Sequence, residues 1–193
     1  MLEVREDVAA AFEELMLRYQ NRVVTVLEHL VGDRSLAEDL AQDVFLRVYR
    51  ARKNYVPGSK FSTWLFKITN NVALNALRSK SRRREINVES ARSGPLGAAR
   101  LDEMVPAASG LMPARQLDKA EMRDIIQLAL ESLNERQRMA VLLSKFEGMN
   151  YADIAATMEM TPKAIKSLLS RARVNLRHVL EPYLERGERP EGK

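Results

Sequence analysis

Apolar side chains recur along this chain every three or four residues, which is the spacing of one face of an α-helix. The first such segment spans residues 8–30, and Gly32 follows it as a stop signal. Its apolar stripe consists of Phe12, Leu15, Tyr19, Val23, Val26 and Leu30. No segment shows the apolar and polar alternation of a half-buried strand. The pattern therefore predicts an all-α fold.

Two more helices are predicted in the first half of the chain. One opens at Ser35, where Glu38 stands three residues later and completes the pattern of a capping box. Pro57 and Gly58 then break the chain. The next helix spans residues 61–78. Its predicted buried stripe consists of Phe61, Leu65, Ile68, Val72 and Ala76.

The middle of the chain lacks this periodicity. Residues 81–116 are rich in Gly, Pro, Ala and Ser, and a structureless segment of this length is too long for a loop within a compact domain. We therefore predict a flexible linker. It separates two small helical domains, residues 1–80 and 117–184, and a polar tail follows at residues 185–193.

The clearest local signal lies in residues 150–180, where a short helix, a tight turn and a longer helix are predicted. Asn150 is a good cap for the first helix, with Asp153 as a box-like partner. Thr161 caps the second, and Pro162 occupies its first position, where the missing N–H costs nothing. Glu159 stands in the turn at a place where Gly is common, so a left-handed conformation there costs about 1 kcal/mol. These signals together predict a helix-turn-helix.

The second helix of this motif has a polar face of one sign. Its apolar positions are Ile165, Leu168, Leu169, Ala172, Leu176 and Val179. Its polar positions include Lys163, Lys166, Ser167, Ser170, Arg171, Arg173 and Arg177. No acidic residue occurs between Pro162 and Leu180. Such a helix suits the major groove of duplex DNA, and an ordinary helical hairpin with a basic surface is the alternative.

A further helix start is predicted just upstream of this motif. Asn134 and Gln137 have the spacing of a capping box. The helix that follows ends at Gly148 in this prediction. Its Met139, Leu142, Leu143 and Phe146 are interpreted as core residues.

The helix at residues 61–78 carries a second unusual face. Beside its buried stripe lies a contiguous polar strip of Trp64, Lys67, Asn71, Asn75 and Arg78. An aromatic ring, two cations and two carboxamides suit an unpaired nucleic-acid strand, since they offer stacking, hydrogen bonds and charge. Core anchoring is the alternative for the indole, and a solvated helix face is the alternative for the two asparagines.

The helix that opens at Ser35 is acidic instead. Its polar face begins with Glu38, Asp39, Gln42 and Asp43. An acidic face repels nucleic acid, so we interpret it as a contact for a basic protein surface. Acidic residues in a first turn also suit the helix dipole, which is the alternative explanation.

Charge is distributed unevenly along the chain. Residues 1–49 carry five basic and ten acidic side chains, whereas residues 50–100 carry twelve basic and two acidic ones. Residues 150–193 are basic again, with eight against six. Basic segments next to an acidic one indicate nucleic-acid contacts and a separate protein partner.

Composition narrows the function classes further. The chain has 193 residues, no cysteine and two histidines, His29 and His178, which lie far apart. Disulfides and cysteine nucleophiles are therefore excluded, and neither a metal nor a cofactor is expected. No apolar run approaches the roughly 18 residues that span a membrane, and the N-terminus is not a signal peptide. We expect a cytoplasmic protein without membrane insertion.

Four segments resemble one known family in their order and spacing. They are AEDLAQDVFLRVYR (37–50), FSTWLFKITNNVALNALR (61–78), LNERQRMAVLLSKFEGMNYADIAATM (133–158) and KAIKSLLSRARVNLR (163–177). The chain resembles a bacterial RNA polymerase sigma factor of the extracytoplasmic-function (ECF) group of the sigma-70 family.

This resemblance implies a non-enzymatic protein that binds core RNA polymerase and directs it to promoter DNA. The first segment would dock on the polymerase clamp through the acidic helix, with Asp39, Leu40, Gln42 and Asp43 as its contact residues. The second would capture bases of the melted minus-ten element, with the loop at residues 55–60 shaping specificity. The fourth would recognise the duplex minus-thirty-five element. Many members of the group are held by an anti-sigma factor, which the resemblance implies as a further partner.

Two other functions fit parts of the pattern. A stand-alone regulator would use the same helix-turn-helix without polymerase, usually as a dimer, but no long heptad provides a dimer helix. A hydrolase or nuclease would need clustered carboxylates or histidines, and the carboxylates of residues 38–43 lack a His or Lys partner. Promoter binding that depends on core polymerase distinguishes a sigma factor from a regulator.

Overall fold

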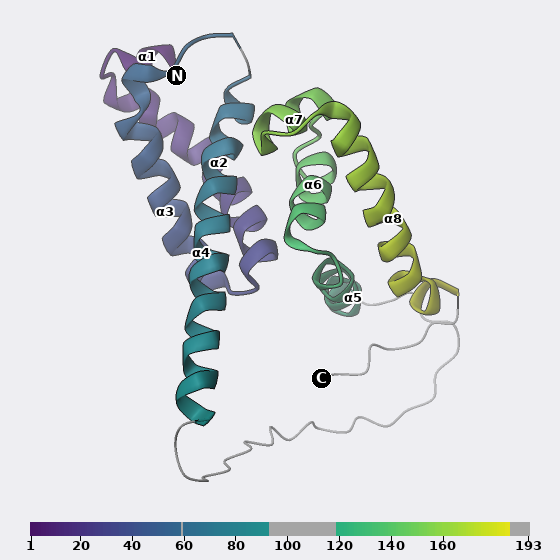
Figure 1. The fold of residues 1–193 in the computed structure, drawn as a ribbon. Coiled ribbons are helices and arrows are strands. Elements are labelled where there is room, and N and C mark those ends of the chain that lie inside the picture. Colours follow the sequence, from purple (N-terminus) through teal and green to yellow (C-terminus); the bar gives the residue numbers. More distant parts are fainter. Residues whose placement is uncertain (59, 93–118, 186–193) are drawn as a thin grey trace.

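The computed structural model describes residues 1–58, 60–92 and 119–185, and within these ranges the chain folds into helices without a strand (Figure 1). The predicted all-α fold is confirmed. Most of the predicted linker and the tail from residue 186 lie outside the described residues. The elements are α1 (Leu2–Arg5), α2 (Ala9–Val31), α3 (Arg34–Arg50), the 3-10 helix η1 (Arg52–Asn54), α4 (Phe61–Arg92), α5 (Lys119–Glu131), α6 (Glu135–Lys145), α7 (Tyr151–Met158) and α8 (Pro162–Glu185).

The helices α2, α3 and α4 pack against one another and, with α1 and η1, form what we call the N-terminal unit. Val23 and Val26 of α2, Val44 of α3 and Phe66 of α4 are fully buried in its apolar core. The predicted stop after α2 is confirmed, because Gly32 has φ +72° and its amide donates to the carbonyl of residue 28 at 2.8 Å.

The predicted start of α3 at Ser35 is wrong. Asp33 is the N-cap instead, and its carboxylate accepts the amide proton of Leu36 at 3.0 Å. Ser35 therefore lies inside the first turn, and the Glu38 carboxylate accepts from Nε of Arg34 at 2.7 Å rather than closing a capping box. Aspartate caps a helix as well as serine does, and its charge adds a favourable interaction with the helix dipole.

The predicted end of the helix near Arg78 is also wrong. Helix α4 continues to Arg92, through residues 81–92 that were predicted as linker. Residues 79–92 contain neither Gly nor Pro and are rich in Lys, Arg and Glu, which are good helix formers. The apolar period ends near Arg78 because it reports packing, whereas the helix itself extends further.

Helices α5 to α8 form what we call the C-terminal unit, and their predicted caps are confirmed. Asn134 and Gln137 make a complete capping box at the start of α6, with distances of 2.9 and 3.2 Å. Asn150 accepts from the third residue of α7 at 2.8 Å, and Thr161 accepts from the third residue of α8 at 3.2 Å. These local side-chain acceptors explain where three of the four helices begin.

The predicted core of α6 is confirmed for Met139, Leu142 and Leu143, which are buried, and is wrong for Phe146. Helix α6 ends at Lys145, so Phe146 leaves the buried stripe and is 48% exposed. Its ring instead lies 5.3 Å from the ring of His29 on α2.

The two units lie side by side (Figure 1). Helix α7 contacts the N-terminal part of α4, and α6 contacts α2. On the α2 side, Arg22 forms an ion pair with Glu147, which follows α6. The surfaces predicted to bind nucleic acid therefore have to be located relative to this contact.

Candidate nucleic-acid interface

The predicted basic face of α8 is exposed along its whole length. All seven of its predicted contact residues are solvent-exposed: Lys163, Lys166, Ser167, Ser170, Arg171, Arg173 and Arg177. The opposite face is held in the core by Ile165, Leu169 and Ala172. The α8 face, as we call these seven residues, is therefore brought together as predicted.

The turn before α8 has the geometry of a helix-turn-helix. Helix α7 ends at Met158, and Glu159 adopts the left-handed conformation with φ 55° and ψ 45°. Two of the α8 arginines are held by their own helix: Arg171 donates to the Ser167 hydroxyl at 3.3 Å and Arg173 donates to the carbonyl of Leu169 at 3.3 Å. These contacts direct both guanidinium groups along α8.

The predicted strip on α4 divides into two parts. Trp64 is half-buried, and its ring lies 5.3 Å from that of Tyr55 and 5.9 Å from that of Phe61. The indole thus packs Tyr55 against the start of α4. This position fits the core-anchoring alternative, and stacking on a base stays a prediction.

The remaining strip residues face the C-terminal unit. Lys67 forms an ion pair with Glu159 at 2.9 Å. Asn71, Asn75 and Arg78 are exposed and line a cleft of about 600 Å³ between α4 and the C-terminal unit. The cleft is lined also by Arg47, Asn70, Leu74, Glu135, Arg136, Met158, Glu159 and Met160. We call Trp64, Lys67, Asn71, Asn75 and Arg78 the α4 strip, and the last three of these residues border the polar cleft.

The cleft also contains Asn70, which the sequence pattern did not indicate. Its side chain is mostly buried, with 8% of the residue exposed, beside Asn71 on the same turn. The pair of consecutive asparagines was the available signal. Periodicity selected Asn71 alone, because Asn71 and not Asn70 lies in the helical register of the strip.

The acidic helix α3 presents its predicted contact residues on an outer face. Asp39 and Gln42 are exposed, whereas Leu40 and Asp43 are partly buried. Asp43 accepts two hydrogen bonds from Nε of Arg47, at 3.0 and 3.1 Å, and this interaction raises the pKa of Arg47. The carboxylate is thus already oriented by an internal cation.

An exposed leucine lies on the same helix and was missed. Leu46 is 55% exposed one turn after Gln42, and an isolated exposed apolar residue carries no signal in sequence. Gln42 also borders a groove of about 330 Å³ between α2 and α3, whose apolar lining includes Met16, Val24 and Phe45. This face combines carboxylates with apolar surface, a composition that suits a protein partner.

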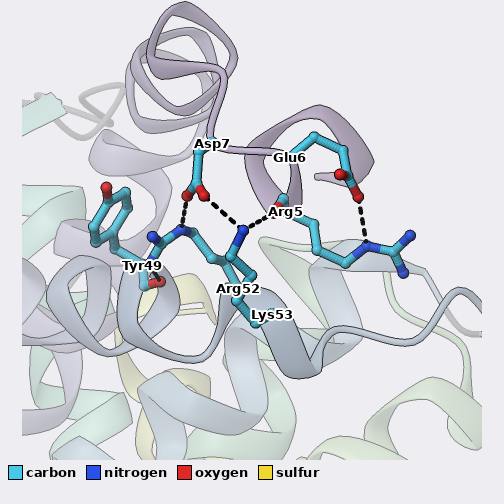
Figure 2. A network of polar contacts seen from close by, with 6 residues as sticks. All are labelled: Arg5, Glu6, Asp7, Tyr49, Arg52 and Lys53. Atoms are coloured by element: carbon cyan, nitrogen blue, oxygen red, sulfur yellow. Dashed lines mark hydrogen bonds and ion pairs between the residues drawn. The ribbon is translucent and has the colours of Figure 1, made fainter.

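The N-terminal segment fastens the end of α3 through a network of polar contacts (Figure 2). Asp7 binds Nε of Arg52 and Nζ of Lys53, both at 2.6 Å. Hydrogen bonds from Lys53 and then Arg52 lower the pKa of Asp7. The Arg52 guanidinium also lies 3.9 Å from the ring of Tyr49. The network holds η1, and thereby the start of the loop that leads to α4.

A half-buried arginine joins the two units and was missed as well. Arg138 donates to the carbonyls of Leu130, Glu131 and Leu133 at the end of α5 and to that of Leu30 near the end of α2, at 2.8 to 3.2 Å. Burial lowers its pKa. A cation at two helix C-termini is favourable, and no sequence pattern predicts that a residue will satisfy carbonyls in two distant helices.

Other site classes find no support in the described part of the chain. Residues 1–58, 60–92 and 119–185 hold no group of three or more His, Asp or Glu side chains that could bind a metal ion. Among the described helices, none is both long and apolar enough to span a lipid bilayer.

Comparison with known sequence families identifies both units. Sigma-70 region 2 matches residues 15–83, and Sigma-70 region 4 matches residues 123–176. The chain belongs to the sigma-70 family. The first match covers α2, α3 and most of α4 and includes the α4 strip, and the second covers most of α5 to α8. This sigma factor thus combines the two units in the order that the sequence predicted.

Curated relatives place the chain in the ECF group of this family. It is 31% identical to the ECF RNA polymerase sigma-E factor of Escherichia coli, over 91% of this chain and 90% of the relative. It is 32% identical to the RNA polymerase sigma-H factor of Pseudomonas aeruginosa, over 90% of this chain and 88% of the relative. The protein is therefore a sigma factor for transcription initiation, which binds core RNA polymerase and promoter DNA.

A solved structure supports the same assignment. The sigma factor RpoE of Bartonella quintana, in complex with the anti-sigma factor NepR, matches with a TM-score of 0.64 and 26% identity. The match covers 89% of this chain and 97% of that one. The similarity extends to both units.

Proposed function

We propose that this sigma factor contacts promoter DNA in two forms: α8 binds duplex DNA upstream of the start site, and the α4 strip binds unpaired bases of the melted element. The observation that carries the proposal is the α8 face, where seven exposed basic and hydroxyl side chains line one side of the second helix of a helix-turn-helix. Lys and Arg there would contact phosphates and guanine edges.

The role of α4 follows from the chemistry of its strip. Lys67 and Arg78 would neutralise phosphates, and Asn71 and Asn75 would donate and accept hydrogen bonds at base edges. Asn70 borders the same cleft and is a further candidate. Trp64 would act by holding Tyr55 against α4, because the two rings lie 5.3 Å apart.

The outer face of α3 is the proposed polymerase contact. Asp39, Leu40, Gln42 and Asp43 would bind a basic surface of the core enzyme. The exposed Leu46 and the groove between α2 and α3 would add apolar area. Arg47 orients Asp43 through hydrogen bonds before any partner binds.

We extend two further properties from the relatives. RpoE of Bartonella quintana was solved with an anti-sigma factor, so an anti-sigma factor is a proposed partner of this chain as well. Because the proposed function acts together with core polymerase on promoter DNA, we expect the protein to be cytoplasmic and to need neither a cofactor nor catalysis by this chain.

Transcription with purified core polymerase tests the proposal. Addition of the sigma factor should create new start sites on genomic fragments, and Arg171→Ala should weaken promoter binding by the holoenzyme and reduce the dependence of that binding on salt. Arg18→Ala is the matched control, because Arg18 is exposed on α2 and pairs with Glu14 at 4.0 Å. Equal binding and equal salt dependence of the two variants would remove α8 from the DNA contact.

A further inference from the structure

A short segment at the start of the sequence precedes the part that Sigma-70 region 2 matches. That match begins at residue 15, whereas α1 spans Leu2–Arg5 and Asp7 follows it. Val4 of α1 is 1% exposed within the apolar core, and α1 contacts both α2 and η1. Figure 1 shows α1 at the end of the N-terminal unit where the chain passes from α3 to α4. The N-terminal segment, as we call residues 1–7, therefore lies near the loop that leads to the α4 strip.

Asp7 ties this segment to η1 (Figure 2). Its carboxylate accepts from Nε of Arg52 and from Nζ of Lys53, both at 2.6 Å. Lys53 also donates to the carbonyl of Arg5 at 2.8 Å. Arg52, whose side chain is 18% exposed, donates to the carbonyl of Tyr49 at 2.8 Å. The network holds two consecutive residues of η1 against the N-terminal segment and against the end of α3.

Asp7 makes these contacts from an unfavourable backbone conformation. Its φ of 64° lies in the left-handed region, which is costly for residues other than Gly. Such strain persists where the surrounding contacts over-determine it, and it is concentrated at functional sites. The strained residue is therefore a reason to ask what the network positions.

Tyr55 follows η1 directly and carries the restraint to α4. Its amide donates to the carbonyl of Arg52 at 3.2 Å, and the residue is 8% exposed. The Tyr55 ring lies 5.3 Å from that of Trp64 and 6.3 Å from that of Phe61. The N-terminal segment also approaches Phe61, because Met1 and Phe61 line the same cavity of about 270 Å³. A path of contacts therefore links the N-terminal segment to the first member of the α4 strip.

We propose that the N-terminal segment sets the position of Trp64 and of the start of the α4 strip for capture of an unpaired strand, with Asp7 as a positioning residue. Asp7 acts through η1 and Tyr55, not by contact with DNA. The inference rests on the proposed binding of unpaired bases by α4. Hydrogen bonds weaken steeply outside a narrow range of distance and angle, so a displaced strip loses affinity for the strand while α8 keeps its affinity for the duplex.

Fluorescence of the full chain tests the position of the indole. Trp64 is the one tryptophan and is half-buried. Asp7→Asn removes the charge but keeps a residue type that tolerates the left-handed conformation, and it should make Trp64 more accessible to quenching by acrylamide. Glu6→Gln removes the same charge from the neighbouring residue, which pairs with Arg5 at 3.2 Å, and should be quenched like the parent. Equal quenching of Asp7→Asn and the parent would overturn the positioning role.

Binding of the holoenzyme to two DNA probes tests the function. Both probes derive from a promoter at which the protein starts transcription: one is the upstream duplex, and the other is a forked fragment that adds the unpaired strand of the melted element. Asp7→Asn should lower affinity for the fork about two- to tenfold, the effect of about one lost hydrogen bond. Association with core polymerase and affinity for the duplex should equal those of the parent. Glu6→Gln should bind both probes like the parent.

A second substitution separates the carboxylate from the backbone. Asp7→Gly favours the positive φ of this position but has no carboxylate, so it should lose as much affinity for the fork as Asp7→Asn does. Parent-like binding of the fork by Asp7→Gly would overturn the role of the carboxylate. A loss of core association and of duplex binding together with fork binding in Asp7→Asn would also overturn the positioning role, because it would show a general loss of structure.

Arg78→Ala distinguishes failure of the inference from failure of the proposed function. If Arg78→Ala weakens binding of the fork and Asp7→Asn does not, the positioning role is overturned and strand binding by α4 stands. If neither variant weakens binding of the fork, strand binding by α4 is overturned and the inference with it.

Discussion

Asp7 shows how one residue compensates for an unfavourable backbone conformation. Its φ of 64° lies in the left-handed region, which costs a non-glycine residue about 1–2 kcal/mol. In return the carboxylate binds both Arg52 and Lys53 (Figure 2). The contact joins residues 45 apart in sequence, so no local pattern predicts it.

The lowered pKa of Asp7 makes its contribution dependent on pH. Because the ionised form is favoured in the folded state, the stabilisation is complete above the ordinary pKa of about 3.8 and disappears as the pH falls through the lower folded value. Asp7→Asn should therefore be less stable than the parent at neutral pH. The difference should shrink in urea unfolding series carried from about pH 5 downward.

Glu6→Gln is the control for this experiment, since Glu6 makes only an exposed pair with Arg5 at 3.2 Å. Its stability should differ little from that of the parent at any pH. A difference between Asp7→Asn and the parent that stays constant with pH would assign the effect to the backbone conformation of residue 7.

At the scale of single helices, local side-chain acceptors determine where several elements begin. Asn134, Asn150 and Thr161 were predictable as caps because each acceptor lies three residues from the amide it binds. The sequence pattern predicted that α3 starts at Ser35, with Glu38 as its partner, whereas the cap in the structure is Asp33, two residues earlier. In the structure Arg34 donates to the Glu38 carboxylate. Glu38 therefore does not complete a capping box with Ser35, and Asp33 caps the helix.

Substitution of Asp33 and of Ser35 tests which of the two residues caps α3. Asp33→Ala should lower the free energy of unfolding by about 0.5–2 kcal/mol, because the amide of Leu36 loses its acceptor. Ser35→Ala, inside the first turn, should stay within about 0.5 kcal/mol of the parent. Chemical denaturation of both variants measures the difference, and a larger loss for Ser35→Ala would restore the capping box as the start of the helix.

Periodicity predicted which residues the helices bury but not which helices contact one another. It found the stripes of α2 and α8 and, apart from Phe146, that of α6, and it ended α4 near Arg78, where the regular apolar spacing in the sequence ends. Asp153 has the spacing of a box partner for Asn150, yet it pairs with Lys60, 93 residues away. Asn71, Asn75 and Arg78 of the α4 strip are exposed, whereas the cleft they border depends on a second unit.

At the scale of the whole molecule, the two units meet along two separate contacts. One joins α4 to α7 through exposed ion pairs. The other joins α2 to α5 and α6 through Arg138, through the ion pair of Arg22 with Glu147, and through His29, whose Nδ1 lies 2.9 Å from the side-chain oxygen of Gln127. Arg138 is half-buried and bound only to carbonyls, and its hydrogen bond to the carbonyl of Leu30 is the one that crosses from α6 to α2.

Arg138→Met tests whether this link couples the units. Four backbone carbonyls would lose a charged donor, so the free energy of unfolding should fall by about 1.5–3 kcal/mol. Trp64 is the one tryptophan in the chain, so its fluorescence reports on the N-terminal unit. Arg138 lies in the C-terminal unit. If the units unfold together, Arg138→Met should lower the urea midpoint measured by Trp64 fluorescence and the one measured by far-UV circular dichroism by the same amount. Arg136→Met, an exposed arginine of the same helix, should shift neither, and a shift of circular dichroism alone would show that the units unfold independently.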